Sequence, residues 1–235
     1  MMYFITPCFN ENDDIILKNI KSIQNQSSNS EIVHKCIFDG VPVRSTISSK
    51  CHNFKNVSFS QTNTNHADYG DYVRRLGTKI SIMNKAYCIG YLDADNTLQP
   101  NHVEEVLKTH KITKKNIIIT KRNIVNADKE LLEDNNRQAF FDTNTITFFN
   151  DLIKIGLLWG RYHNQLSLIG DRIISQYIKK HHFNDVAYTD KKTVNYTLSR
   201  ISTKKTYNLK QWLRDNQNLI NDNFAQKFGF RLSLE

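Results

Sequence analysis

Short apolar runs alternate with amphipathic stretches over the first hundred residues. Residues 3–6 form an apolar run that predicts a strand ending at Pro7. Asn and Asp residues then precede isoleucines at helical spacing over 15–23, which predicts a helix with a polar N-terminal cap. A second strand is predicted over 31–38 and ends at Asp39. This β-α-β pattern predicts parallel strands joined by a right-handed crossover.

The same alternation repeats after the second strand. A short strand is predicted over 57–59, a polar loop over 61–70 and a helix over 73–85, which delivers the chain to an apolar strand over 87–92. Two consecutive units of this kind predict a mostly parallel central sheet flanked by helices. The expected fold class is therefore α/β, with a Rossmann-like sheet and a C-terminal helical extension.

The second half of the chain gives weaker patterns. Strands are predicted over 117–120 and 146–149, and a helix over 172–178. An apolar, Trp-bearing segment over 152–162 would either wall a substrate pocket or pack in the core. Near the C-terminus an amphipathic helix would rest on an anionic membrane surface, pack on its own domain or contact another subunit. Its apolar residues are Leu209, Trp212, Leu213, Ile220 and Phe224.

Composition places the chain among globular proteins. The 235 residues are 39% hydrophobic and include 13 Phe and 10 Tyr, enough for one large core or two small ones. The four cysteines lack metal-site or disulfide spacing, which favours reduced, packed thiols. Neither a leader pattern nor an apolar run of bilayer length occurs, so we expect a cytoplasmic protein, with peripheral contact at the inner face of the cell membrane as an option.

The formal net charge of +9 and the pI near 9.3 favour anionic partners. Nucleic acid, nucleotide sugars and acidic lipids all carry such charge. The basic residues are spread along the chain without an RNA- or DNA-binding motif, so no nucleic-acid partner is expected. His181 and His182 face different sides of a helix and have no carboxylate at ligand spacing, which leaves them unassigned.

Two carboxylates follow the apolar strand at 87–92. In extended backbone, residues i and i+2 face the same side, so Asp93 and Asp95 can point at one cation while Ala94 turns away. Mg²⁺ and Mn²⁺ prefer carboxylate oxygens and leave positions for the phosphate oxygens of a nucleotide. Open α/β sheets also bind ligands at the carboxyl ends of their strands. A solvated turn that carries two acids is the alternative.

Three segments resemble, in this order, the nucleotide-binding elements of GT-A-fold glycosyltransferases, close to glycosyltransferase family 2: Thr6-Pro7-Cys8-Phe9-Asn10-Glu11, Phe38-Asp39-Gly40 and Leu92-Asp93-Ala94-Asp95. Three more resemble elements of a bacterial branch of these enzymes: Asp68-Tyr69-Gly70-Asp71 with Arg74, Asp142-Thr143-Asn144, and Gly170-Asp171-Arg172. The ordered set covers about residues 3–175 and is more specific than any one of its motifs.

The resemblance implies a nucleotide-sugar site. Phe9 matches an aromatic residue that stacks on the base, Asp39 an acid that binds the base, and Arg74 an arginine that contacts the base or the diphosphate. The structural alternatives are a core phenylalanine, a turn aspartate and a solvated arginine. Asp68 and Asp71 match the motif without an assigned role. The remaining residues of the nucleotide-sugar site would be Thr6, Pro7, Glu11, Asp93 and Ala94.

The resemblance also implies an inverting, metal-dependent transfer. Mn²⁺ or Mg²⁺ held by Asp95, with Asp93 nearby, would neutralise the departing nucleoside diphosphate. Asp171 matches the acid that removes the proton of the acceptor hydroxyl, and Gly170 would leave room for the substrate. Asp142 is the second candidate for this base. Alternatively, Asp171 only caps the helix that follows it.

The expected function is transfer of a sugar from a nucleotide sugar, with a UDP-sugar as the first choice of donor, to a hydroxyl of a glycan or glycolipid in bacterial surface polysaccharide synthesis. We expect a catalytic domain over 1–207, divided into a nucleotide-sugar half (1–108) and an acceptor half (109–207), and an amphipathic helix over 208–235. A homo-oligomer is compatible with the sequence.

Two other classes of function stay open. A sugar nucleotidyltransferase usually carries a Gly-rich basic loop after its first strand, which this chain lacks. A non-catalytic, basic nucleic-acid-binding module would leave the acids at the strand ends without a purpose, because carboxylates repel phosphate. The chain departs from many family 2 members at Asp39, which is a single acid, and at Asn96, which leaves the base and the metal open.

Overall fold

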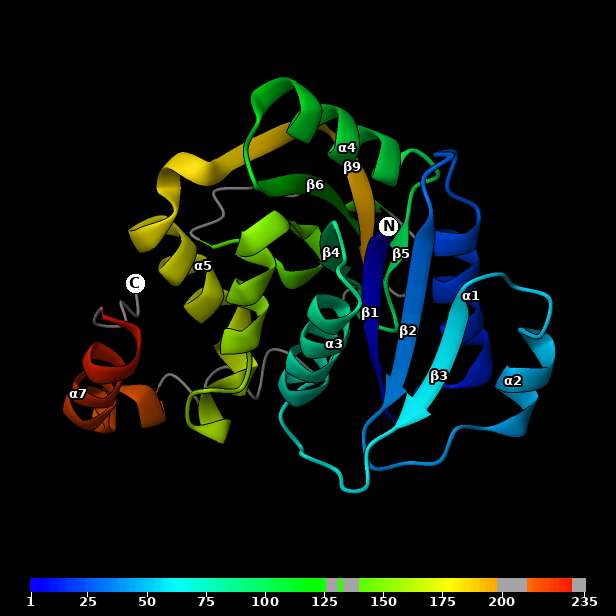
Figure 1. The fold of residues 1–235 in the computed structure, drawn as a ribbon. Helices are drawn as coiled ribbons and strands as arrows, with labels where there is room; N and C mark the ends of the chain where they lie inside the picture. The colour runs from blue at the N-terminus through cyan, green and yellow to red at the C-terminus, as the bar shows by residue number, and fades with distance from the viewer. Residues whose placement is uncertain (126–130, 133–139, 198–210, 230–235) are drawn as a thin grey trace.

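In the described part of this protein, nine strands form one mixed sheet with helices on both faces (Figure 1). The computed structural model describes residues 1–125, 131–132, 140–197 and 211–229. The strands lie in the order β3-β2-β1-β4-β8-β6-β9-β5, and β7 pairs with β6. Their bounds are β1 Met2–Cys8, β2 Ile32–Phe38, β3 Val57–Gln61, β4 Cys88–Tyr91, β5 Thr97–Leu98, β6 Ile117–Val125, β7 Leu131–Leu132, β8 Ile146–Phe149 and β9 Val186–Thr197.

The helices begin where the sequence supplies caps and turns. Asn12 caps the first helix, because its side chain accepts a hydrogen bond from the Ile15 N–H at 2.9 Å. Gly70 precedes the third helix at φ +85°, and a side chain there would collide with Pro7. The α-helices are α1 Asp13–Gln24, α2 Ser45–Lys50, α3 Asp71–Met83, α4 His102–Thr113, α5 Gly170–His181 and α7 Gln217–Phe228. The 3₁₀ segments are η1 Thr143–Thr145, η2 Asn150–Leu158, η3 Asn164–Ile169 and η4 Phe183–Asp185.

The first four strands of the sheet order, β3-β2-β1-β4, are all parallel, as the β-α-β pattern predicted. The chain moves outward from β1 to β3 and then returns to pair β4 with the other edge of β1. The strand order therefore reverses beside β1, and ligands bind in open α/β sheets at the carboxyl ends of strands at such a point.

The sheet is more mixed in the second half of the chain than the pattern predicted. There β8 runs antiparallel to both β4 and β6, and β5 runs antiparallel to β9, whereas β6 and β9 are parallel. Strand β9, helix α4 and helix α2 were not predicted, because their apolar positions are interrupted by Lys, Thr and Ser. Strand β4 belongs to the predicted nucleotide-sugar half (1–108) and its neighbour β8 to the predicted acceptor half (109–207). Strands of both halves therefore share one sheet.

Helices cover both faces of the sheet (Figure 1). Helices α3 and α5 and segment η2 bury apolar side chains such as Val73, Ile174 and Ile153 against one face. Helices α1, α2 and α4 cover the other face through Ile20, Ile47 and residues of α4. The four cysteines are buried and free, as expected.

The described C-terminal residues pack on the chain itself. Leu213 and Ile220 are buried in a cluster with Leu166 of η3 and Ile173 of α5. This supports the alternative in which the helix packs on its own domain, while contact with a membrane or a second subunit stays a prediction. Leu209, the Phe224 side chain and the predicted boundary at 207/208 lie outside what the structure describes. Among the described residues, no helix has the length and apolarity needed to cross a membrane.

Candidate active site

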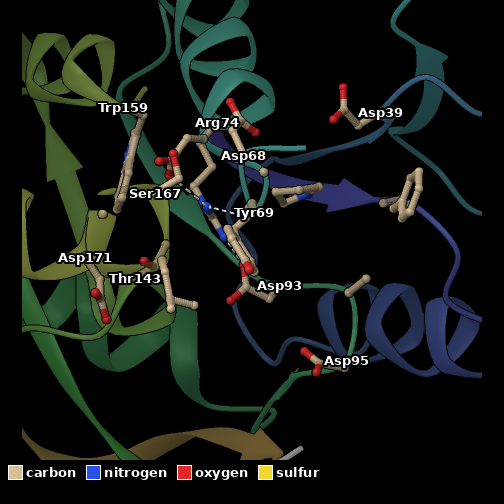
Figure 2. A pocket seen from close by; sticks show the side chains of 18 of the residues that line it. Asp39, Asp68, Tyr69, Arg74, Asp93, Asp95, Thr143, Trp159, Ser167 and Asp171 are labelled. Atoms are coloured by element: carbon tan, nitrogen blue, oxygen red, sulfur yellow. Dashed lines mark hydrogen bonds and ion pairs between the residues drawn. The ribbon is translucent and has the colours of Figure 1, made fainter. Parts of the chain in front are cut away.

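A cavity of about 660 Å³ opens at the carboxyl ends of β1, β2 and β4. Of the eleven residues predicted for the site, ten line this cavity, although the first and last of them are 164 positions apart (171 − 7): Pro7, Phe9, Glu11, Asp39, Arg74, Asp93, Ala94, Asp95, Asp142 and Asp171. Figure 2 shows Asp39 and Asp95 on one side, Arg74 and Asp93 in the middle, and Thr143, Trp159 and Asp171 on the other side. The folded chain therefore brings together the residues that the motifs singled out.

Thr6 is the exception, and its assignment to the nucleotide-sugar site is corrected. Its side chain is fully buried on the face of β1 that α1 covers, where its hydroxyl lies 2.8 Å from His34 Nε2 and 3.3 Å from Asn19 Oδ1. Strand side chains alternate between the two faces, so Thr6 points into the core beneath α1. Its contribution is to the packing of β1 on α1 and β2.

The end of the cavity near Asp39 carries an exposed aromatic ring. Phe9 is 37% exposed at the rim, which contradicts the core alternative for this residue. The Glu11 carboxylate accepts a hydrogen bond from the Phe9 N–H at 2.7 Å and so fixes the turn after β1. An exposed ring at the mouth of a cavity offers a flat apolar surface to a planar base.

Asp39 is buried and is held by the loop that follows β3. Its Oδ1 accepts from the Thr62 hydroxyl at 2.9 Å and lies 2.6 Å from His66 Nδ1, while its Oδ2 accepts from the His66 N–H at 3.0 Å. The His66 ring stacks on Tyr72 of α3 at 3.6 Å. Asp39 thus fastens the loop as a turn aspartate would and still faces the cavity. Sequence reasoning gave His66 no role of its own.

Arg74 is buried in the middle of the cavity, which contradicts the solvated alternative. Its guanidinium pairs with Asp93 and lies 3.3 Å from Asp71, and the Trp159 ring lies 5.3 Å from it (Figure 2). Burial works to lower the pKa of Arg74, but the charges of Asp93 and Asp71 outweigh it and raise the pKa. The guanidinium therefore stays charged beside Asp93.

Asp71 explains why Gly170 is a glycine. The Tyr162 hydroxyl donates to Asp71 Oδ2 at 2.6 Å, and a side chain at position 170 would collide with that hydroxyl and with the Asp71 carboxylate. The direction of a side chain at Gly170 is thus filled by the protein's own groups, while Gly170 itself lines the cavity, so room for the substrate beside it stays a prediction. Asp71 and Tyr162 instead join α3 to the segment before α5.

The two acids after β4 differ in their surroundings. Asp93 pairs with Arg74 and also accepts from Asn144 Nδ2 at 3.1 Å, whereas Asp95 is exposed toward the open cavity. Although this side chain reaches the open cavity, the protein around it displaces part of the water from its carboxyl group. This desolvation, together with the charge of Asp93, raises the pKa of Asp95 to about 7. Since a nearby cation would relieve this repulsion, the pair fits a hard divalent ion chemically.

The two carboxylates do not form a complete metal cage. Among the described residues, no group of three or more His, Cys, Asp and Glu side chains is arranged to hold an ion. Mg²⁺ commonly binds through one or two carboxylates plus substrate phosphates, and Asp93 and Asp95 match that kind of site. These two residues would hold the ion, and a diphosphate would supply further oxygens.

Asp171 lies in the first turn of α5 at the other end of the cavity (Figure 2). Its Oδ1 accepts a hydrogen bond from the Arg172 N–H at 2.8 Å. Burial and the charge of Asp142 raise the pKa of Asp171 to about 7, a value suited to a group that takes up a proton near neutral pH.

Asp142, the second candidate base, has both oxygens occupied. Arg122 Nη1 donates to its Oδ2 at 2.6 Å, and the Asn144 N–H and Nδ2 each donate to its Oδ1 at 2.9 Å. Asp142 therefore acts in the free protein as an anchor for Asn144. The sequence contained a signal for Asn144, which belongs to the Asp-Thr-Asn element, but none for Arg122, an ordinary basic residue on β6.

Comparison with solved structures defines the class of fold, which is that of GT-A-type glycosyltransferases. Among the solved structures, this chain is similar to S. aureus TarS, at a TM-score of 0.65 and 14% identity, covering 99% of this chain and 46% of that chain. TarS 1–349 in complex with UDP matches at a TM-score of 0.63 and 13% identity over 97% of this chain and 72% of that chain.

A third structure, TarS 1–349 in complex with UDP-GlcNAc, matches at a TM-score of 0.61 and 13% identity over 96% of this chain and 75% of that chain. This chain thus spans less than half of the longer TarS chain. No protein-family model and no curated protein matches the sequence.

Proposed function

We propose that this protein is a glycosyltransferase that moves a sugar from a UDP-sugar to a hydroxyl of a glycan or glycolipid, with inversion at the anomeric carbon and with Mn²⁺ or Mg²⁺ as cofactor. The observation that carries the proposal is the arrangement of groups in one cavity: Asp39 and Asp95 on one side, Arg74 with Asp93 in the middle and Asp171 on the other side. Phe9 also lines the cavity and follows Cys8, whose carbonyl accepts from the Asp39 N–H at 2.8 Å. The likeness to TarS structures determined with UDP and UDP-GlcNAc supports a nucleotide-sugar donor.

The donor would lie along the cavity from one end to the other. The base would stack on Phe9 and donate an imide N–H to Asp39, both at the strand ends where open α/β sheets bind nucleotides. The diphosphate would then reach Arg74 and the strand-end acids in the middle. When bound there, a divalent ion supplies positive charge that stabilises the departing nucleoside diphosphate. This placement leaves the transferred sugar next to Trp159 and Asp171.

Asp171 would act on the acceptor. Its carboxylate takes the proton of the acceptor hydroxyl as that oxygen forms a bond to the anomeric carbon. The bond from this carbon to the diphosphate oxygen breaks on the opposite face, and its electron pair leaves with the nucleoside diphosphate. Because one displacement occurs, the product has the inverted configuration.

Ligand screening tests the donor and the metal. We expect UDP and UDP-sugars to raise the melting temperature more than GDP, CMP or dTDP compounds, and to do so more strongly with Mn²⁺ than with EDTA. A ligand at about 100 times its dissociation constant stabilises a fold by about 2.7 kcal/mol, which such a screen detects. Full transfer activity in EDTA would contradict the metal, and NMR of the product's anomeric carbon decides between inversion and retention.

The cellular role completes the proposal. We place the protein in bacterial surface polysaccharide synthesis at the inner face of the cell membrane, where lipid-linked acceptors present their hydroxyls. Membrane contact and self-association are tested by co-sedimentation with anionic vesicles and by sedimentation velocity.

A further inference from the structure

The side chain of Asn144 joins two loops of the cavity that are distant in sequence. Asp93 follows β4, and Asn144 lies in η1 just before β8, the antiparallel neighbour of β4. Gly90 pairs with Thr147 in this ladder, so three further residues along each strand place Asp93 opposite Asn144. The strand register therefore brings the amide to the strand-end acid.

Every polar atom of this amide has a partner. Asn144 Oδ1 accepts from the Asp93 N–H at 2.6 Å, and Nδ2 donates to Asp93 Oδ2 at 3.1 Å and to Asp142 Oδ1 at 2.9 Å. The reverse orientation of the amide would set its carbonyl oxygen against two carboxylates. Asn144 is only 4% exposed, so water cannot easily replace these bonds.

Asn144 is itself held in place by Asp142 and Arg122. Asp142 accepts from both nitrogens of Asn144, and its other oxygen pairs with Arg122 of β6. A chain of hydrogen-bonded groups thus runs from Arg122 through Asp142 and Asn144 to Asp93. Arg74 holds the remaining oxygen of Asp93, so Arg74 and Asn144 together determine how this carboxylate faces the cavity.

We infer that Asn144 is a positioning residue, which orients Asp93 so that its carboxylate is presented to a divalent ion bound together with the donor's diphosphate. This inference rests on the proposed function. Without the amide, Asp93 would be free to turn fully onto Arg74, and its oxygens would no longer face the ion. A residue that orients a metal ligand from behind in this way typically affects metal affinity about 10- to 100-fold.

The test compares UDP affinity with and without metal. Titration calorimetry of the full chain with UDP, once in EDTA and once in saturating Mn²⁺, gives the factor by which Mn²⁺ tightens UDP binding. In Asn144→Ala we expect this factor to fall about tenfold or more, while the affinity in EDTA stays nearly unchanged. Asn144→Asp should lose at least as much, because it adds a third carboxylate beside Asp93 and Asp142.

Two further variants keep the result interpretable. Asn123→Ala is the matched control, because it removes one amide hydrogen bond, to Asn195 at 3.0 Å, from a residue that does not line the cavity. Its Mn²⁺ factor should equal that of the wild type. Arg122→Gln removes the support of Asp142 from behind and should lower the factor by a smaller amount, which tests the inference even if Asn144→Ala does not fold.

Each remaining outcome has a definite meaning. An equal loss of UDP affinity with and without Mn²⁺ in Asn144→Ala would overturn the inference, since it would show a collapsed pocket and no effect on the ion. An unchanged Mn²⁺ factor in Asn144→Ala would overturn it as well. A wild type that binds no UDP in either condition would instead overturn the proposed function, and with it the inference.

Discussion

The substitution Asp171→Asn should stabilise the ligand-free protein at pH 8 while it abolishes sugar transfer. At that pH the Asp171 carboxyl is ionised although its pKa is raised to about 7, so the folded chain holds a charge that its surroundings disfavour. Asparagine has the same shape and no charge. A group that catalyses from a partly buried position commonly reduces stability in this way.

The size of the gain in stability follows from the difference between the pKa of Asp171 in the folded and in the unfolded protein. The carboxyl changes from an ordinary value of 3.8 to about 7 on folding, and about three units at 1.36 kcal/mol each give about 4 kcal/mol. Because Asp171 borders an open cavity, we reduce this to about 2–4 kcal/mol. Between pH 4 and 7 the folded state binds more protons than the unfolded state, so the free energy of unfolding falls as pH rises through this window.

Urea unfolding of the ligand-free protein measures this effect. The difference between Asp171→Asn and the wild type should be largest at pH 8 and should vanish near pH 3, where both side chains are uncharged in both states. Asp151→Asn is the control, because Asp151 is exposed, and it should change stability by less than about 0.5 kcal/mol. If Asp171→Asn is no more stable than the wild type at pH 8, the claim that the ionised Asp171 carboxylate destabilises the folded protein is refuted.

Activity is the second half of the same prediction. Loss of a general base lowers kcat by about 10² to 10⁴, and in the wild type kcat should fall as the pH drops below about 7. UDP affinity should be nearly unchanged, because Asp171 lies at the far end of the cavity from Asp39. An active Asp171→Asn protein would refute the base assignment and make Asp142→Asn the next variant to assay.

Three further substitutions separate function from stability. Asp95→Asn should weaken the Mn²⁺-dependent part of UDP binding, measured by calorimetry, and leave the melting temperature of the free protein within a few degrees, because this carboxylate faces the open cavity. Phe9→Leu should weaken UDP binding by about 1 kcal/mol with little loss of stability, since the ring is 37% exposed. Thr6→Val should lower the free energy of unfolding by about 1–3 kcal/mol without changing UDP affinity, because buried His34 and Asn19 lose their hydroxyl partner. A loss of UDP binding without a loss of stability would show that Thr6 belongs to the nucleotide-sugar site after all.

The elements near the site could be predicted from the sequence because their patterns are local. The strands at β1, β2 and β4 are short apolar runs, and Asp39 follows β2 directly while Asp93 follows β4 after one residue. Because these strands are parallel, both acids must lie at the same edge of the sheet. That reasoning placed Asp39 and Asp93 in one cavity. The assignment of Thr6 came from the motif resemblance, and it failed because successive side chains of a strand point to opposite faces of the sheet.

The other half of the site depends on contacts that no local pattern contains. Whether β8 runs parallel or antiparallel to β4 decides if Asn144 meets Asp93, and residues 146–149 are equally apolar in either case. The pairing of Arg74 with Asp93 requires α3 to pack beside β4, which depends on the whole sheet order. The order of the motifs along the sequence identified Arg74, Asp93 and Asn144, whereas the contacts among them are defined only by the folded structure.

Net charge was the least informative property of the sequence, and the cavity explains why. The chain carries a formal charge of +9, yet eight carboxyl groups and one arginine are among the residues that line the cavity. The lining acids are Glu11, Asp39, Asp68, Asp71, Asp93, Asp95, Asp142 and Asp171. A diphosphate would be repelled by such a surface at short range, since screening by salt is weak in a partly enclosed site. The excess of basic residues can attract a nucleotide from solution, and we expect its phosphates to bind beside Asp93 and Asp95 together with a cation that offsets the repulsion.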